Sequence, residues 1–381
     1  MKLIFFIFCI WAPLQAQIVN IPDVNFKNKL LAHNPIIDTN SNGEIEVAEA
    51  EAVLFPLNVA ATVPAIVDIT GIEAFINIEA FNCAGNLIEN LDLSANTLLL
   101  TLDCSNNAIT TINLSQNVFL KNFTGSQNPY TSLDLSNNAD LEFFQSNAGS
   151  LTTLTLGNKP HLQFLYAYGN ALTQLDISNC PILEGLTVDE NNLSHIDLSN
   201  NNQLRYFYGR SNLFTSLDVS NNPTIIALDL KWNDALTYIN LKNGNNGNLN
   251  ISGTGQTCNF EELPLLETVC LDDVNSSLAS FIEAQAGHSV VFTENCPLSI
   301  EDVVQVKATF HPNPVKDMIT IEATGKILEI QLYNLLGELV MNSKTNNYSI
   351  EIDISDFSKG LYILTIKDEF NNVQSVKILK E

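Results

Sequence analysis

Apolar and polar residues alternate in a short pattern that recurs from about Phe81 to Leu241. A four-residue phrase of the LDLS type begins every 21 residues, at Leu91, Ile112, Leu133, Leu154, Leu175, Ile196 and Leu217. A second series of large apolar residues keeps the same step: Phe81, Leu102, Phe123, Phe144, Leu165, Leu186, Phe207 and Leu228. The alternation predicts a short strand with one buried face in each phrase. The fixed step predicts stacked coils, each too small to bury its own apolar face.

Asparagine recurs at two further positions of each coil. The first column holds Asn86, Asn107, Asn128, Asn170, Asn191, Asn212 and Asn233 and is broken at Gly149. The second column holds Asn96, Asn117, Asn138, Asn201 and Asn222 and is broken by Lys159 and Cys180. A buried amide can bond backbone groups that a turn leaves without partners. We therefore interpret both columns as structural and not as ligand sites.

The phrase Leu99-x-x-Leu102-x-Cys104-x-x-Asn107-x-Ile109 resembles the leucine-rich-repeat signature, in the short bacterial variety with two phrases in each coil. The resemblance implies a mostly β fold, a leucine-rich-repeat solenoid of 21-residue coils. We place the solenoid at residues 66–250, between a short helical N-terminal cap (17–65) and a C-terminal cap (251–297). Residues 298–307 are expected to be a linker, and residues 308–381 a separate antiparallel β-sandwich.

Residues 1–16 have the pattern of a secretory signal peptide. Lys2 precedes the apolar run Leu3–Trp11, which is too short to span a bilayer, and Ala16 is a small residue suited to cleavage. A buried N-terminal strand is the alternative. No later apolar run approaches the length of a transmembrane helix. The net charge of −25 disfavours nucleic acid as a partner, because nucleic acid attracts basic surfaces.

The N-terminal cap contains a candidate calcium loop. Helices are expected at Val24–His33, with Asp23 as the N-cap, and at Val47–Phe55. The intervening loop matches the spacing D-x-[DN]-x-[DN]-G-x5-E. Its expected ligands are Asp38, Asn40, Asn42, the carbonyl of Glu44, Glu46 directly or through water, and Glu49 with two oxygens. We expect weak, structural calcium binding, and a metal-free turn rich in Asn and Asp is the alternative.

Aromatic and cationic residues gather on one predicted strand face, which we call the aromatic strand face. It comprises Phe143, Phe164, Tyr166, Tyr168, Tyr206, Tyr208, Arg210, Lys231 and Trp232. Exposed aromatic residues that cluster in this way commonly mark a contact surface. The alternative is that these rings pack on each other and only stabilise the sheet. The outward column on the other strand of each coil is acidic and is expected to be solvated.

Seven cysteines are present, and Cys9 lies in the signal peptide. Cys83 and Cys104 share one inward repeat position and are expected to be small core residues, although a bridge between their coils is possible. An exported protein can oxidise its thiols. We expect a Cys270–Cys296 disulfide, with Cys258 free or alternatively paired.

The C-terminal module shows five stretches typical of strands, at Met318–Ala323, Ile327–Tyr333, Ser349–Ile354, Gly360–Lys367 and Gln374–Leu379. The motifs Pro312-Asn313-Pro314, Tyr333-Asn-Leu-Leu-Gly337-Glu338, Asp353-Ile-Ser355, Gly360-Leu-Tyr362 and Val376-Lys-Ile-Leu-Lys380 resemble the sorting domain of type IX secretion cargo in Bacteroidetes. The resemblance implies recognition by the secretion machinery, cleavage in the linker, and a secreted protein, extracellular or on the outer-membrane surface. A plain β domain is the alternative.

No catalytic constellation is present: the chain lacks HExxH, GxSxG, Walker, CxxC and dinucleotide-binding motifs. An enzyme is therefore not expected. The sequence favours a secreted or cell-surface binding or adhesion protein that contacts a protein partner through the aromatic strand face. The alternatives are binding of an extracellular polysaccharide and a structural surface-layer role without a specific ligand.

Overall fold

The computed structural model describes residues 17–252, 256–296, 308–334, 338–368 and 373–381. The chain divides into two compact units, Met1–Glu294 and Asn295–Glu381, each described by itself below. The predicted signal peptide and the predicted linker lie outside the described residues and stay predictions. No helix in the described residues is long and apolar enough to span a bilayer.

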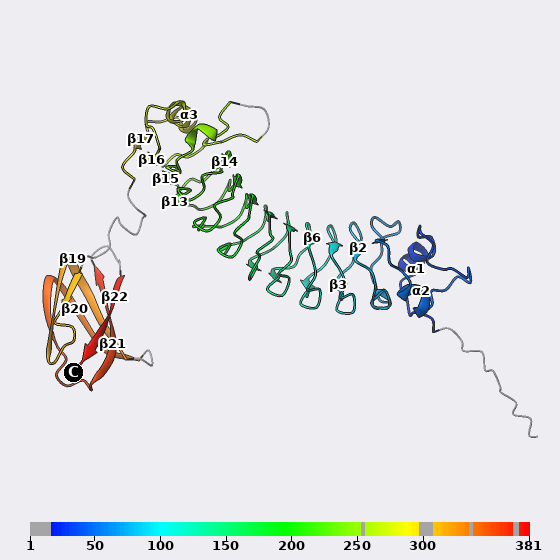
Figure 1. Ribbon diagram of the computed structural model, residues 1–381, viewed down its shortest axis with the longest axis horizontal. Helices are drawn as coiled ribbons and strands as arrows, with labels where there is room; N and C mark the ends of the chain where they lie inside the picture. The colour runs from blue at the N-terminus through cyan, green and yellow to red at the C-terminus, as the bar shows by residue number, and fades with distance from the viewer. Residues whose placement is uncertain (1–16, 253–255, 297–307, 335–337, 369–372) are drawn as a thin grey trace, which may run out of the picture. The chain divides into compact units, whose positions relative to one another are not determined.

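The first unit is a succession of stacked coils whose strands line up along the solenoid (Figure 1). Nine strands form one parallel sheet in the order β1 (Leu57–Asn58), β2 (Ala80–Asn82), β4 (Thr101–Asp103), β6 (Asn122–Thr124), β8 (Phe143–Gln145), β10 (Phe164–Tyr166), β11 (Gly185–Thr187), β12 (Tyr206–Tyr208) and β14 (Ala227–Asp229). Phe81 pairs with Leu102, Leu102 with Phe123, and so on along the sheet. The 21-residue step therefore fixes the register, as predicted.

The LDLS-type phrases form shorter sheets on the other side of the coils. These pair β3 (Asn90–Leu91) with β5 (Thr111–Ile112) and β7 (Ser132–Asp134) with β9 (Thr153–Thr155), and align β13 (Ser216–Asp218), β15 (Tyr238–Asn240), β16 (Thr268–Cys270) and β17 (Val291–Thr293). The phrases that begin at Leu175 and Ile196 have no strand assignment, so the expectation of a strand in every phrase is wrong there. Their apolar residues are still buried.

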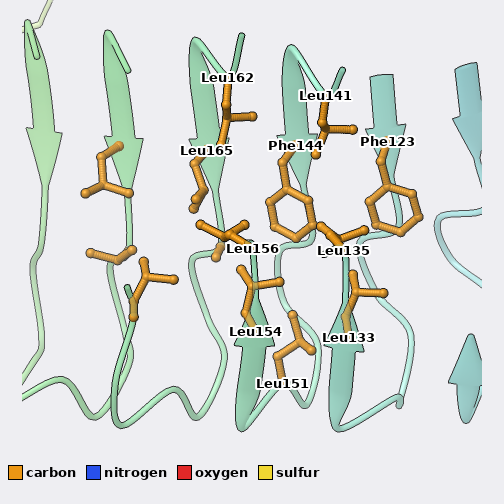
Figure 2. Packing of buried hydrophobic residues seen from close by; sticks show 14 of the residues in the cluster. Phe123, Leu133, Leu135, Leu141, Phe144, Leu151, Leu154, Leu156, Leu162 and Leu165 are labelled. Atoms are coloured by element: carbon orange, nitrogen blue, oxygen red, sulfur yellow. The ribbon is translucent and has the colours of Figure 1, made fainter. Parts of the chain in front are cut away.

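The core lies between the two sets of strands. Figure 2 shows Phe123, Phe144 and Leu165 on one set and Leu133 and Leu154 on the other, stacked from coil to coil. Phe123 and Phe144, one coil apart, also stack with their ring centroids 5.7 Å apart. A single coil is too small to bury its own apolar side chains. Side chains of adjacent coils complete their burial, so neighbouring coils stabilise one another.

Both asparagine columns are structural, as predicted. In the first column, Asn191 Nδ2 donates to Ala167 O (2.9 Å) in the preceding coil and to Val188 O (3.1 Å) in its own. Its Oδ1 accepts from Leu172 N at 3.0 Å. In the second column, Asn117 Nδ2 donates to carbonyls of the preceding coil, Leu93 O (3.1 Å) and Asn96 O (2.9 Å). The side chains thus connect turns that strand pairing does not reach.

Lys159 occupies the second column as a buried substitute for asparagine. Its side chain is fully buried. The Nζ atom donates to Leu135 O (2.8 Å) in the preceding coil and to Leu156 O (2.5 Å) in its own. The next member of the column, Cys180, has no amide with which to reach Leu156 O. Lys159 therefore supplies the hydrogen bond that an asparagine at position 180 would supply. Burial lowers the pKa of Lys159.

The two N-terminal helices are shorter than predicted. Helix α1 is Val24–Leu31, and its N-cap is Asp23 as expected, since the carboxylate accepts from Asn25 N (2.7 Å) and Phe26 N (3.1 Å). Helix α2 is Val47–Glu51. Helix α2 has its C-cap at Ala52. Phe55 disfavours the helical conformation because it directly precedes Pro56, where strand β1 is about to begin. The local amphipathic pattern therefore predicts a helix that is too long.

The C-terminal cap continues the coils. A short 3-10 helix, η2 (Asn246–Asn248), follows the last coils. Helix α3 (Ser277–Ala286) ends at Gly287, whose φ of 73° suits a glycine C-cap. Cys270 and Cys296 are both disulfide-bonded, as the predicted pair requires. The thiols of Cys83, Cys104, Cys180 and Cys258 are free and buried.

The second unit is an antiparallel sheet of β18 (Ala308–His311), β19 (Met318–Tyr333), β20 (Leu339–Asp353), β21 (Gly360–Asp368) and β22 (Val373–Lys380). The two strands expected at Met318–Ala323 and Ile327–Tyr333 are one long strand with β-bulges, and β18 was not predicted. The bulges let β19 pair with β18 along its first part and with β21 along its second. Its core is formed by residues such as Ile319, Ile330, Leu364 and Ile378.

Candidate functional site

The aromatic strand face lies on the outer side of the nine-stranded sheet. Register brings Phe143, Phe164, Gly185 and Tyr206 side by side, and likewise Tyr166, Thr187 and Tyr208. Side chains at these positions point away from the core because successive residues of a strand alternate between its faces. The 21-residue step thus brings rings from separate coils onto one surface, as the sequence predicts.

Three rings of the face pack against each other. Phe143 and Tyr166 meet edge to face with centroids 5.6 Å apart, and Phe164 and Tyr166 lie 6.2 Å apart. Gly185 permits this arrangement, since a Cβ at that position would lie 2.8 Å from Phe164 Cδ1. All three rings are half-buried. They form a platform of packed rings, and part of each ring is covered by its neighbours in the platform.

Two further rings of the face are exposed: Tyr168 follows β10, which carries part of the platform, and Trp232 follows β14, three strands along the sheet. Tyr168 is 41% exposed and Trp232 is 49% exposed. Tyr206 carries Arg205 over its ring at 5.5 Å, and Trp232 carries Lys231 Nζ at 4.6 Å from its centroid. The hydroxyl of Tyr208, in contrast, is buried and has no hydrogen-bond partner among the described residues. Tyr168 and Trp232 are therefore the rings best placed to meet a partner.

Each cation of the face is paired with carboxylates. Arg210 Nη2 lies 3.2 Å from Asp189 Oδ2, and Arg210 Nε lies 3.8 Å from Asp229 Oδ2. Lys231 Nζ lies 2.5 Å from Glu261 Oε2. Sequence reasoning placed Asp189 among the solvent-facing residues, but the structure buries it beneath Arg210. The face therefore presents aromatic rings and neutralised charge, and not a free cationic patch.

Burial raises the pKa of both carboxyl groups beside Arg210. The pKa of Asp229 is raised to about 6, because desolvation outweighs the hydrogen bond from Lys231 N and the attraction of Arg210. Desolvation likewise raises the pKa of Asp189 above its ordinary value, against the hydrogen bond from Arg210 N. The pairing at this end of the face is therefore sensitive to mildly acidic pH.

The acidic column on the other strands has a structural role. Asp92, Asp134 and Asp176 each accept a hydrogen bond from the backbone N–H of the serine two residues on, at 2.9–3.0 Å. These bonds close the turn after each LDLS-type phrase. They also lower the pKa of each of the three carboxyl groups. The column is a row of turn caps, exposed to solvent as expected.

In the candidate calcium loop, hydrogen bonds join the predicted ligands Asn40 and Asn42 to Glu46, whereas Glu49 is bonded to other groups. Glu46 Oε1 accepts from Asn40 Nδ2 (3.2 Å) and Asn42 Nδ2 (2.6 Å). Asp38 accepts from Asn42 N (3.2 Å). Glu49, expected to supply two oxygens, instead accepts from Thr39 and from Glu46 N. No group of three or more His, Cys, Asp and Glu in the described part of the chain is arranged to hold a metal.

Residues 309–381 match the family model described as the secretion system C-terminal sorting domain. The chain is 36% identical over 88 residues to ulvan lyase NLR42 of Nonlabens ulvanivorans. The aligned segment covers 23% of this chain but only 16% of the lyase. Among solved structures, the functional domain of InlJ from Listeria monocytogenes is similar with 17% identity, a TM-score of 0.34, and coverage of 96% of this chain and 99% of that one. An internalin C2 from the same organism shows 19% identity, a TM-score of 0.38, and coverage of 57% and 88%.

The C-terminal match covers the described second unit from Thr309 onward and agrees with the motifs found there. It indicates a protein that is secreted or held at the outer-membrane surface. The first unit is a ladder of parallel strands with a leucine-rich-repeat pattern, built from 21-residue coils. The chain thus joins a solenoid with a leucine-rich-repeat pattern to a domain that matches the secretion system C-terminal sorting domain.

Proposed function

We propose that this protein is an extracellular binding or adhesion protein that contacts its partner through the aromatic strand face. The observation that carries the proposal is the exposure of Tyr168 and Trp232 on the same face as a platform of packed rings. The platform itself stands on paired strands, so its rings lose little conformational entropy on binding. The sorting domain supports this function because it delivers the solenoid to the outside of the cell.

A protein is the first candidate partner. Aromatic residues and arginine are enriched at the centres of protein interfaces, where charged residues are usually depleted or paired. The aromatic strand face has this composition, with Arg210 held between Asp189 and Asp229. The pairing of its cations also means that a highly anionic partner is not favoured.

A polysaccharide is the second candidate partner. Tyrosine and tryptophan offer an apolar ring with one polar, hydrated edge, which suits the ring faces and hydroxyl groups of a sugar. The neutralised charges around Trp232 supply hydrogen-bonding groups without a net charge, as a neutral glycan requires. A structural surface-layer role is the third candidate, and it predicts self-assembly without any partner.

The test compares the wild-type protein with the double variant Tyr168→Ala/Trp232→Ala on protein and glycan arrays. Truncation of two interface aromatics should weaken binding to any genuine partner at least tenfold. Phe119→Ala is the matched control, because Phe119 is 48% exposed but lies in the turn between β5 and β6, outside the face. A folded double variant with wild-type affinity would disprove the role of the face. Self-assembly without array hits would favour the surface-layer role.

A further inference from the structure

The carboxylate of Glu46 is buried and only half satisfied. The side chain is 4% exposed. Its Oε1 accepts from the amides of Asn40 and Asn42, whereas its Oε2 is buried without a hydrogen-bond partner in the described residues. A buried carboxylate oxygen without a partner loses the hydrogen bonds that water would give it, which destabilises the folded state. Such an oxygen is a natural ligand for a cation.

Further oxygens lie in the same loop. Asp38 is also buried, and its two oxygens accept from Asn42 N (3.2 Å) and Gly43 N (2.9 Å), which draws the loop around the carboxylate. Gly43 makes the sharp turn possible with a φ of 79°. The side-chain amides of Asn40 and Asn42 now direct nitrogen at Glu46. A half-turn of either amide presents its oxygen there instead.

The donor set selects the type of cation. It contains only oxygen atoms, from two buried carboxylates, two amides and the backbone carbonyl of Glu44. Oxygen donors in a flexible loop suit Ca²⁺, whereas Mg²⁺ requires a near-octahedral site and gives up its water reluctantly. Glu49 is not needed as a direct ligand. Its carboxylate already accepts hydrogen bonds from Thr39 N and Thr39 Oγ1, each at 2.7 Å.

The loop is joined to the N-terminal segment through Glu46 and its neighbours. Ile18 and Glu46 form an antiparallel bridge. Val19 N donates to Ile45 O at 2.8 Å, and Val47 N donates to Gln17 O at 2.8 Å. A cation that holds Glu46 therefore also holds residues 17–19, which cover one side of the cap through buried Val19.

We propose that the loop Asp38–Glu49 binds Ca²⁺ with Glu46, and not Glu49, as its anchoring carboxylate, and that the bound ion fastens residues 17–19 to the cap. The dissociation constant should be on the order of 10⁻⁴–10⁻³ M, because only two carboxylates contribute directly. A site of this affinity is occupied at the roughly millimolar calcium concentration of extracellular fluids. It is empty at the low calcium concentration inside cells. The cap then tightens after export.

The first experiment measures thermal melting and calorimetric calcium binding of the full chain, with Glu46→Gln and Glu44→Gln as the test and its control. Both variants remove one negative charge from the same loop. Glu44 contributes only its backbone carbonyl to the site, while its side chain pairs with Lys27 at 2.6 Å. Calcium should raise the melting temperature of the wild type and of Glu44→Gln but not of Glu46→Gln. Asp38→Asn provides a second test variant if Glu46→Gln fails to fold.

The test uses about 10 mM calcium, roughly tenfold above the upper end of the expected dissociation constant. An unchanged melting temperature and no binding heat at this concentration would overturn the site. Equal responses of wild type and Glu46→Gln would overturn the role of Glu46. Hydrogen exchange tests the fastening separately. If opening of the segment requires release of the ion, exchange at Val19 and Val47 should slow about tenfold at ten times the dissociation constant. Calcium binding without this slowing would overturn the fastening alone.

Discussion

At the residue scale, two interruptions of the asparagine columns are compensated by a different side chain nearby. Gly149 lacks the amide that would bond Gly125 O. The hydroxyl of Tyr130, which is buried, donates to Gly125 O at 2.7 Å instead and lies 2.7 Å from Ser146 Oγ. Gly125 must be glycine for this contact, since a Cβ there would lie 2.5 Å from the Tyr130 hydroxyl. Lys159 compensates for Cys180 in the other column in a similar way.

The variant Tyr130→Phe should lower the free energy of unfolding by about 1–3 kcal/mol, because it leaves Gly125 O and Ser146 Oγ with fewer partners in the core. Urea denaturation measures the change. Tyr238→Phe is the control, since the Tyr238 hydroxyl is buried and has no hydrogen-bond partner in the described residues. Its loss should be nearly neutral. Equal effects of the two substitutions would show that the Tyr130 hydroxyl contributes no net stability.

At the element scale, strands β11, β12 and β14 carry a charge cluster that depends on their register. Tyr208 pairs with Thr187 on one side and Asp229 on the other. Arg210, two residues beyond Tyr208, therefore reaches Asp189, which follows β11, and Asp229 at the end of β14. The carboxyl groups are buried, and their pKa values are raised. A group whose folded-state pKa is raised binds its proton more tightly in the folded state.

For Asp229, the raised pKa predicts a contribution to stability that is present below its ordinary pKa of 3.8 and is lost as pH rises to about 6. The variant Asp229→Asn cannot titrate. Relative to this variant, the wild type should lose up to about 1.4 kcal/mol of unfolding free energy for each pH unit in that window. Urea denaturation of both proteins between pH 4 and pH 7 measures the difference. A difference that stays constant with pH would contradict the raised pKa.

At the scale of the whole molecule, the solenoid and the sorting domain belong to separate compact units. The solenoid ends in its own C-terminal cap, which includes α3 and Cys270, before the second unit begins. The sorting domain has its own apolar core. The two units can therefore be changed independently, although one chain carries both.

Deletion of residues 309–381 should abolish delivery to the cell surface of a host with type IX secretion, since this segment matches the sorting domain. Immunoblotting of the medium and of surface, periplasmic and cytoplasmic fractions measures the distribution, and the truncated protein should be retained in the periplasm. Full-length Trp232→Ala, altered only in the first unit, should be exported like the wild type. Normal surface delivery of the truncated chain would contradict the role of the segment.

The repeat pattern was sufficient to predict much of the fold. The 21-residue step predicts the register of the nine-stranded sheet, and the apolar series predicts the core, because each coil of a solenoid contacts mainly its neighbours. The sequence also indicated the N-cap of α1 and the exported tail. Helix ends were less predictable, since α2 stops where the approach to Pro56 and β1 overrides its local pattern.

Only the tertiary structure decided which side chains satisfy one another across coils. It buried Lys159 among carbonyls, placed the Tyr130 hydroxyl opposite the gap at Gly149, and neutralised Arg210 between two carboxylates. In the candidate calcium loop, it left one oxygen of Glu46 buried without a hydrogen-bond partner and directed Glu49 to Thr39 and to Glu46 N. These contacts depend on rotamers and on residues about one coil apart, which a periodic pattern does not encode. The sequence by itself determined the ladder, whereas packing determined the chemistry displayed on it.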